Sequence, residues 1–294
     1  MPKTLGILFL HGIGTLQMHM DPDAPYSKDL EKGILERLPH AKKANVAFQE
    51  VIYQDVLDQY QSVYFEEAMK KGLDDRWTRL LFMKILGDAT AYANNKVKVQ
   101  VKGVAETLYN SVHGKIDQAI AELEGKLDPG AKLVVLAHSL GGLVFCNYIY
   151  DILHDSRGGL PPLNTPFRKL ETCEAMVTFG CNIPLFAMTL DQFKPISIPL
   201  SNHGIPPNSG AYRKRRWLNV YDRDDPLGWP LLPLTKTKCR DPQHAGILKA
   251  TVVDKNLEVG AFWNPLQTTL ASHLLYWGDS GFAKKVCGHI KAYI

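Results

Sequence analysis

The sequence predicts an α/β fold with a mainly parallel sheet, and three observations support this prediction. Short, nearly continuous apolar runs recur along the 294 residues, as expected of strands buried on both faces. Stretches with apolar residues at helical spacing separate these runs. Turn-forming or polar residues end each run. Strands that alternate with helices indicate βαβ units, and such units form parallel sheets.

Six strands are expected in chain order. They cover Leu5–Leu10, 44–53, Lys132–Ala137, Ala175–Phe179, Trp217–Tyr221 and Leu248–Val253. Apolar residues at helical steps predict one helix from Val104 to Leu127, which Asp128-Pro129-Gly130 ends, and another from Leu140 to Leu153. Polar segments near 155–166 and 195–210 are expected to form loops over the edge of the sheet. We therefore expect one domain over residues 1–294.

Composition excludes several classes of protein. A content of 45% hydrophobic and 22% charged residues is typical of a globular protein with a sizeable core. The net charge of +4 is small, and the only dense basic cluster is Arg213–Arg216, so no nucleic-acid partner is expected. No apolar stretch approaches the length of a membrane span, and the first apolar run is too short for a signal peptide.

The cysteines indicate a reducing compartment. They are five, an odd number, and they are scattered without any Cys-x-x-Cys pair, so neither a zinc knuckle nor a redox dithiol is expected. A cytoplasmic location fits best. The sequence predicts no metal and no organic cofactor.

The most informative segment is Leu133–Gly142, which reads LVVLAHSLGG. It places Ser139 at a sharp turn between a buried strand and a helix, which would lift the hydroxyl clear of the sheet. The small residues Ala137 and Gly141 let such a turn close. The helix that begins at Leu140 would point its first N–H groups at an oxyanion formed on Ser139. The alternative is a glycine-rich connection that serves tight packing alone.

Two motifs resemble those of a known superfamily. Ala137-His-Ser-Leu-Gly-Gly142 and His11-Gly-Ile-Gly14 resemble the nucleophile elbow and the oxyanion loop of α/β-hydrolase lipases and esterases. The resemblance implies an α/β-hydrolase fold and a serine hydrolase, with the backbone N–H groups of Ile13 and Leu140 as oxyanion donors. On physical grounds, Gly12 and Gly14 would also let the backbone after His11 approach a substrate oxygen closely.

The acid of such a site should follow a later strand, and three aspartates follow Trp217–Tyr221. Relatives in the superfamily often have Asp-Pro followed by an aliphatic residue, which selects Asp225. Asp222 remains the alternative because it lies nearer to the end of the strand. A third interpretation is that these aspartates only favour the turn.

The base should follow the acid in the chain, which leaves His244, His273 and His289. The segment His273-Leu-Leu-Tyr-Trp277 resembles the His-x-x-Tyr-Trp neighbourhood of several lipase-like sequences, so His273 is the predicted base. His289 is expected on the terminal helix, and His244 before the final strand. His138, next to the serine, is expected to pack or to support the turn.

A helical insertion is expected at about residues 57–103, because the segment is longer than a crossover needs and shows no strand signal. Two apolar stripes are predicted there; they comprise Tyr60, Val63, Tyr64 and Met69, and Trp77, Leu80, Leu81 and Ile85. The insertion is either a core-facing helix or a cap over Ser139 that opens at a lipid surface.

Together these expectations describe a Ser139–Asp225–His273 triad that cleaves a carboxylic ester, of a small molecule or a lipid, through an acyl-enzyme. Peripheral contact with lipid is compatible with them, and they leave the oligomeric state open. Two alternatives stay open at this point. The same triad could act on a thioester, an amide or a phospholipid, or the chain could be a catalytically silent binding module with a hydrolase fold.

Overall fold

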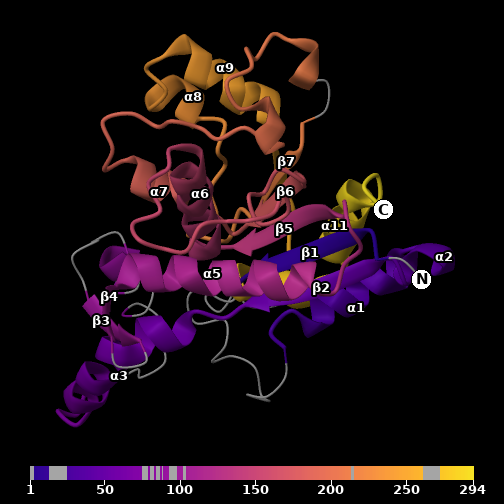
Figure 1. Cartoon of the computed structure of the whole chain (residues 1–294). Coiled ribbons are helices and arrows are strands. Elements are labelled where there is room, and N and C mark those ends of the chain that lie inside the picture. The colour runs from indigo at the N-terminus through magenta and orange to yellow at the C-terminus, as the bar shows by residue number, and fades with distance from the viewer. Residues whose placement is uncertain are drawn as a thin grey trace.

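A computed structural model describes residues 3–12, 25–74, 79, 83, 87, 89–92, 98–101, 104–212, 215–260 and 272–294. Its centre is a six-stranded sheet in the order β2-β1-β5-β6-β7-β8, and every neighbouring pair is parallel (Figure 1). The strands span Leu5–Leu10 (β1), Val46–Val51 (β2), Lys132–His138 (β5), Cys173–Phe179 (β6), Trp217–Tyr221 (β7) and Val252–Asn256 (β8). Helices flank this sheet, so the predicted α/β architecture is confirmed.

The α-helices between and after these strands cover both faces of the sheet. Their bounds are Lys28–Arg37 (α1), His40–Lys43 (α2), Gln54–Met69 (α3), Leu108–Glu124 (α5), Leu140–Leu153 (α6), Ile183–Ala187 (α7), Leu234–Thr237 (α8), Pro242–Thr251 (α9) and Ser280–Ile290 (α11). Short 3₁₀ turns cover Leu200–Asn202, Gly210–Tyr212 and Tyr276–Gly278. A two-stranded antiparallel hairpin joins Lys98–Val101 (β3) to Val104–Thr107 (β4).

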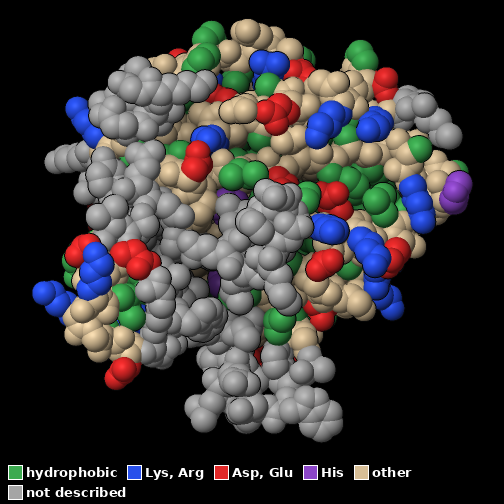
Figure 2. Space-filling model, turned by 90° about the horizontal axis from the view of Figure 1, so that it is seen from below, with side chains coloured by type: hydrophobic (Ala, Val, Ile, Leu, Met, Phe, Trp, Pro, Cys, Tyr) green, Lys and Arg blue, Asp and Glu red, His purple; other side chains and the backbone are tan. Residues whose placement is uncertain are grey.

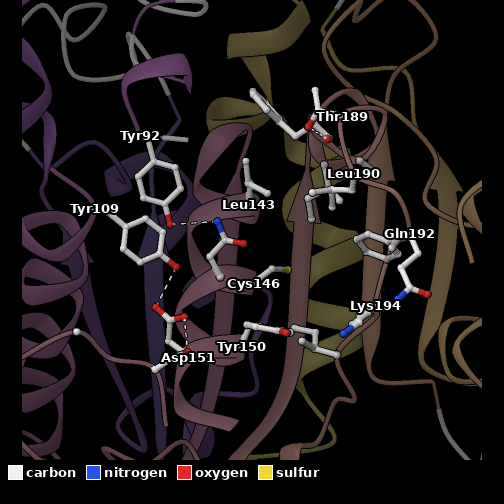
Figure 3. Close-up of a pocket in the computed structure, with 18 of the residues that line it drawn as sticks. Tyr92, Tyr109, Leu143, Cys146, Tyr150, Asp151, Thr189, Leu190, Gln192 and Lys194 are labelled. Carbon is white, nitrogen blue, oxygen red and sulfur yellow. Dashed lines mark hydrogen bonds between the residues drawn. The ribbon is translucent and has the colours of Figure 1, made fainter. Parts of the chain in front are cut away.

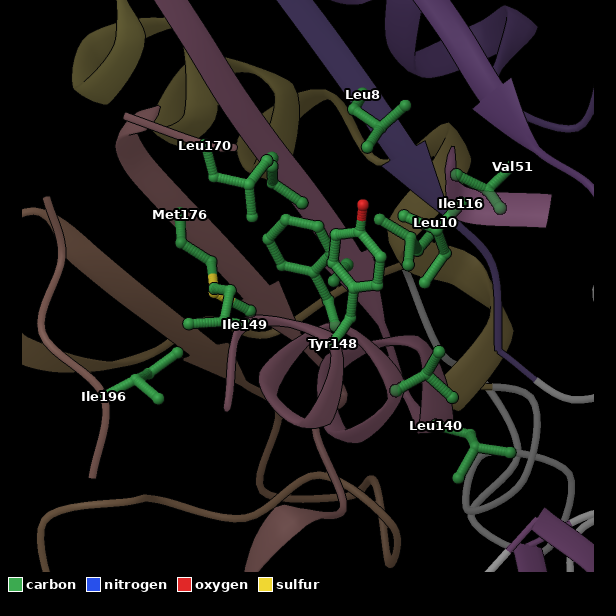
Figure 4. Packing of buried hydrophobic residues seen from close by; sticks show 14 of the residues in the cluster. Leu8, Leu10, Val51, Ile116, Leu140, Tyr148, Ile149, Leu170, Met176 and Ile196 are labelled. Carbon is green, nitrogen blue, oxygen red and sulfur yellow. The ribbon is translucent and has the colours of Figure 1, made fainter. Parts of the chain in front are cut away.

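Two apolar clusters hold the helices to the sheet. On one face, Leu8 and Leu10 of β1 pack with Ile116 of α5 and with Tyr148 and Ile149 of α6 (Figure 4). On the other face, α1 and α11 pack against each other and against the alternate side chains of the same strands. All six residues of β1 are buried, which is why this strand is a continuous apolar run rather than an alternating one.

The amino ends of the strands lie together with both ends of the described chain. The N–H groups of Thr4 and Leu5 donate to the carbonyl of Asn45. The amine of Lys42 donates to the carbonyl of Ile294, at 2.8 Å. The strands therefore run away from both chain ends toward the opposite edge of the sheet, which we call the carboxyl edge (Figure 1).

Three expectations about elements were wrong. The segment 248–253 belongs mostly to a helix, because α9 continues to Thr251 and β8 begins only at Val252. The helix expected from Val104 begins at Leu108, since the four preceding residues pair with β3. The expected absence of strands before Gly103 therefore also fails, because β3 lies there.

The insertion expected at 57–103 is described only in part. Its first helix, α3, is present, but Tyr64 is 65% exposed and does not belong to a buried stripe. The second stripe, of Trp77, Leu80, Leu81 and Ile85, lies outside the described residues. Whether the segment covers Ser139 therefore stays a prediction.

Within the described ranges, no helix is both long enough and apolar enough to cross a membrane. On the face of the molecule seen in Figure 2, acidic and basic side chains are interspersed over the described surface. No strongly basic stripe covers the described part of that face.

Candidate functional site

The turn between β5 and α6 forces an unusual backbone on Ser139. Its φ of 52° and ψ of −125° lie in a region that residues with a side chain rarely adopt. The Ser139 N–H donates to the carbonyl of Phe179 in β6, at 3.0 Å, and the Ser139 carbonyl accepts from Gly142. Neighbouring strands and the first turn of α6 thus hold the strained residue in place.

Two glycines allow the end of β1 to approach this turn. A Cβ at Gly12 would lie 2.3 Å from the Cβ of Ser139, and one at Gly141 would lie 2.7 Å from the carbonyl oxygen of His11. Neither position has room for a side chain. Ala137 is fully buried and lies in register with Leu10 of β1. The two loops that the sequence singled out therefore lie in direct contact.

Ser139, His273 and Asp225 form one chain of hydrogen bonds. The Nε2 of His273 lies 2.8 Å from the Oγ of Ser139. Its Nδ1 lies 2.9 Å and 3.0 Å from the two carboxylate oxygens of Asp225. All three residues are buried, between 1% and 3% exposed. Because an aspartate oxygen accepts at Nδ1, the nitrogen that faces Ser139 is free to take the hydroxyl proton.

Asp225 is held as a carboxylate. Its oxygens accept from the N–H of Leu227 at 2.9 Å and from the hydroxyl of Tyr276 at 3.1 Å. Burial opposes ionisation, but His273 and the N–H of Leu227 outweigh it and keep the pKa of Asp225 below its usual value. A Cβ at Gly228 would lie only 2.5 Å from Oδ2, so a glycine is needed beside the carboxylate.

Asp222, the rival acid, points away from His273. One of its oxygens accepts from the N–H of Val259 at 2.6 Å, and the other accepts from the N–H of Asp224 at 2.9 Å. Its own N–H donates to the hydroxyl of Tyr276. Asp222 thus ties together three segments around the site without touching the histidine ring.

His138 packs against His273 and bonds to its backbone. Its Nε2–H donates to the backbone carbonyl of His273 at 2.6 Å, and the two rings lie 4.6 Å apart between centroids. Burial lowers the pKa of His138 well below its usual value, so the ring is neutral. Its Nδ1 has no hydrogen-bond partner among the described residues. The expected supporting role of His138 thus takes a specific form.

Only one of the two proposed oxyanion donors lies within the described residues. Leu140 is buried and is the first residue of α6, so its N–H has no acceptor within that helix. Ile13 and Gly14 lie outside the described residues. His11 is buried; its carbonyl accepts from the hydroxyl of Tyr53, and its ring stacks on that tyrosine at 4.2 Å.

The remaining candidate histidines lie elsewhere. His289 is on α11, as expected, and its Nε2 lies 3.2 Å from the carbonyl of Arg216. His244 is on α9 and lines a pocket with His154 and His203. Tyr276 is a site residue that the sequence did not predict. Its hydroxyl accepts from the N–H of Asp222 and donates to the carboxylate of Asp225. Its position three residues after His273 was the signal that could have identified it.

Among the described residues, no group of three or more histidine, cysteine or acidic side chains is placed to hold a metal ion. All five cysteines are free thiols. The chain matches no known family profile and no curated protein.

Proposed function

We propose that this protein is a serine hydrolase of the α/β-hydrolase type, with Ser139 as nucleophile, His273 as general base and Asp225 as the residue that orients the base. The observation that supports this most directly is the buried hydrogen-bond chain from Oγ of Ser139 through His273 to Asp225. The strained strand-to-helix turn at Ser139 and the parallel sheet are both consistent with that type.

In the proposed reaction, the Nε2 of His273 takes the proton of Ser139 as Oγ attacks the carbonyl carbon of an ester. The N–H of Leu140, with Ile13 as the expected second donor, stabilises the oxyanion. The protonated His273 then gives its proton to the leaving alcohol. Water then gives a proton to the same histidine and attacks the acyl-enzyme. As the bond between the acyl carbon and Oγ breaks, His273 returns this proton to Oγ, which frees Ser139 and the carboxylic acid.

A carboxylic ester is the proposed substrate class, and the substrate is a small molecule or a lipid. The same triad could act on a thioester, an amide or a phospholipid ester, since the geometry is shared by these acyl transfers. A panel of acyl substrates that differ in leaving group and chain length separates them. The free thiols favour a reducing compartment, so a cytoplasmic location is part of this proposal.

The experiment that tests the proposal is labelling with a fluorophosphonate, followed by intact-mass measurement. Wild-type protein should gain one adduct, because an activated serine attacks phosphorus and a resting serine does not. The Ser139→Ala variant should gain none. A folded wild-type protein that gains no adduct would contradict the proposal and favour the silent binding module.

A further inference from the structure

A groove of about 810 Å³ runs along the outer side of α6, and none of the three proposed triad residues lines it. Figure 3 shows Leu143, Cys146 and Tyr150 in succession along the helix. Leu143 and Tyr150 are about two turns, or about 10 Å, apart. The volume falls within the usual range of about 300–1,000 Å³ for small-molecule sites.

One wall of this groove is aromatic, and its polar atoms are already engaged. Tyr92 and Tyr109 stack at 5.1 Å between ring centroids. The hydroxyl of Tyr92 lies 2.9 Å from the Nε2 of His113, and that of Tyr109 donates to Asp151. Asp151 also accepts from Ser156. Because these groups satisfy one another, this wall offers a ligand mainly carbon surface.

The opposite wall is apolar for most of its length and polar at one end. Its apolar residues are Ile183, Phe186, Ala187, Leu190, Phe193 and Ile196. At the Tyr150 end, Gln192 and Lys194 complete the lining (Figure 3). Neither side chain has a hydrogen-bond or ion-pair partner within the described part of the chain. They are the donors left free to meet a ligand.

Beyond Lys194 the groove continues into a smaller pocket of about 440 Å³, which shares Tyr150, Gln192, Lys194 and Ile196 with it. Its lining combines the imidazoles of His154, His203 and His244 with apolar side chains that include Leu153 and Ile247. Its one carboxylate, of Asp241, accepts from the N–H of Gln243 and caps α9. Among the described residues that line the two pockets, the carboxylates are Asp151 and Asp241, and the only Lys or Arg is Lys194.

We propose that this groove is a binding site for an anionic amphiphile, with its apolar chain along α6 and its carboxylate or phosphate at Gln192 and Lys194. An anionic head group is favoured over a cationic one because Lys194 is the only Lys or Arg among the described lining residues, whereas both oxygens of Asp151 already accept from hydroxyls. The site does not include Ser139, so it stands whether or not the chain is a hydrolase.

The test uses calorimetric titration of the full-length Ser139→Ala protein with three probes that share one chain: decanoate, decan-1-ol and decyltrimethylammonium. Working in the Ser139→Ala background keeps turnover out of the measurement. We expect decanoate to bind most tightly and with one site per chain. Equal or tighter binding of decyltrimethylammonium would overturn the anionic assignment.

Variants locate the site. Leu143→Trp should weaken decanoate binding by at least about tenfold, because the indole fills the groove. Leu185→Trp is the matched control, since Leu185 is 40% exposed on α7 and does not line the groove. Cys146→Phe fills the groove from the next turn of α6 and replaces Leu143→Trp if that variant does not fold. Unchanged decanoate binding in a folded groove-filling variant would overturn the proposal.

Lys194→Met tests the charged end while keeping an apolar stem of similar length. Decanoate binding should weaken about fivefold, the size expected of a charged pair at an exposed position. Binding of decan-1-ol should not change. Equal losses for decanoate and decan-1-ol would contradict a role for the charge.

Discussion

At the scale of single residues, Asp225 and Asp222 lie close together and have identical side chains, but they bond to different groups. Both are buried and both contact Tyr276, yet only Asp225 reaches the imidazole of His273. The sequence could narrow the acid to these two, since turn-forming aspartates follow the strand. It could not decide between them from spacing alone, because the choice depends on which carboxylate faces a histidine 48 residues later.

Asp225→Asn and Asp222→Asn should therefore fail in different ways. Asp225→Asn should lower kcat for ester hydrolysis by about 10³- to 10⁴-fold, because an amide no longer favours the required histidine tautomer. Asp222→Asn should keep labelling by a fluorophosphonate but lower the free energy of unfolding by about 1–3 kcal/mol, since its amide faces an N–H donor. For each variant, denaturant titration measures the free energy of unfolding, and the rate of fluorophosphonate labelling measures how active the serine remains. Equal activity losses without instability would contradict the division of roles.

His138 makes stability depend on pH. Burial lowers its pKa in the folded protein, so the folded state binds fewer protons than the unfolded one. The stability contributed by the neutral ring is thus present above the unfolded pKa of about 6.5 and is lost as pH falls below it. The slope is at most about 1.4 kcal/mol per pH unit for one proton. Burial lowers the pKa of His113 and His289 in the same direction, so the three share the decline.

Urea unfolding at about pH 7.5 and about pH 5.5 checks this dependence. Wild type should lose stability at the lower pH. His138→Gln should lose less, because the amide can still donate to the carbonyl of His273 but does not titrate in this range. An identical decline in both proteins would assign the pH dependence to the other two histidines.

At the scale of elements, ambiguous patterns explain the errors in prediction. The run Leu248–Val253 looked like one strand, but Ile247, Leu248 and Thr251 are the buried face of α9, and only Val252 and Val253 belong to β8. Short apolar runs do not distinguish a buried helix from a strand. Likewise, the four residues of β4 continue the helical spacing of α5, and only their pairing with β3 sets them apart.

Thr107 marks the true start of α5. Its Oγ1 accepts from the N–H of Asn110 at 3.2 Å, which satisfies one of the unpaired donors of the first turn. Thr107→Ala should therefore lower the free energy of unfolding by about 1 kcal/mol, and Thr107→Ser by much less. Thermal melts of the two variants make the comparison. A serine variant as unstable as the alanine variant would argue against capping.

The contact between the end of β1 and the start of α6 is equally specific. Gly12→Ala should slow fluorophosphonate labelling by about 10²-fold, because the new methyl overlaps Ser139 and displaces the turn. Gly114→Ala is the control; this glycine lies within α5, where a Cβ meets only Leu160 at 3.7 Å. That change should stabilise the protein by about 0.5–1 kcal/mol. Normal labelling of Gly12→Ala would show that the turn can adapt.

At the scale of the whole molecule, parallel strands explain why distant residues could be assigned to one site from the sequence. The carboxyl ends of β1, β5 and β7 lie at one edge, so the loops that follow them bring Gly12, Ser139 and Asp225 together. The order of the strands was not predicted, because apolar strands carry little information about their neighbours. The groove along α6 was not predicted either, since its walls come from segments that meet only after folding.

The position of the chain ends has a practical consequence. Thr4 and Ile294 are both anchored beside residues 42–45, at the amino ends of the strands. Ser139 follows the carboxyl end of β5, which at about 3.3 Å per residue lies roughly 20 Å away across the sheet. A fusion partner, an affinity tag or a tether to a solid support, joined at either end, would thus be held on the side opposite the candidate site. Protein immobilised by either end would therefore have the carboxyl edge, where Ser139 lies, turned away from the support.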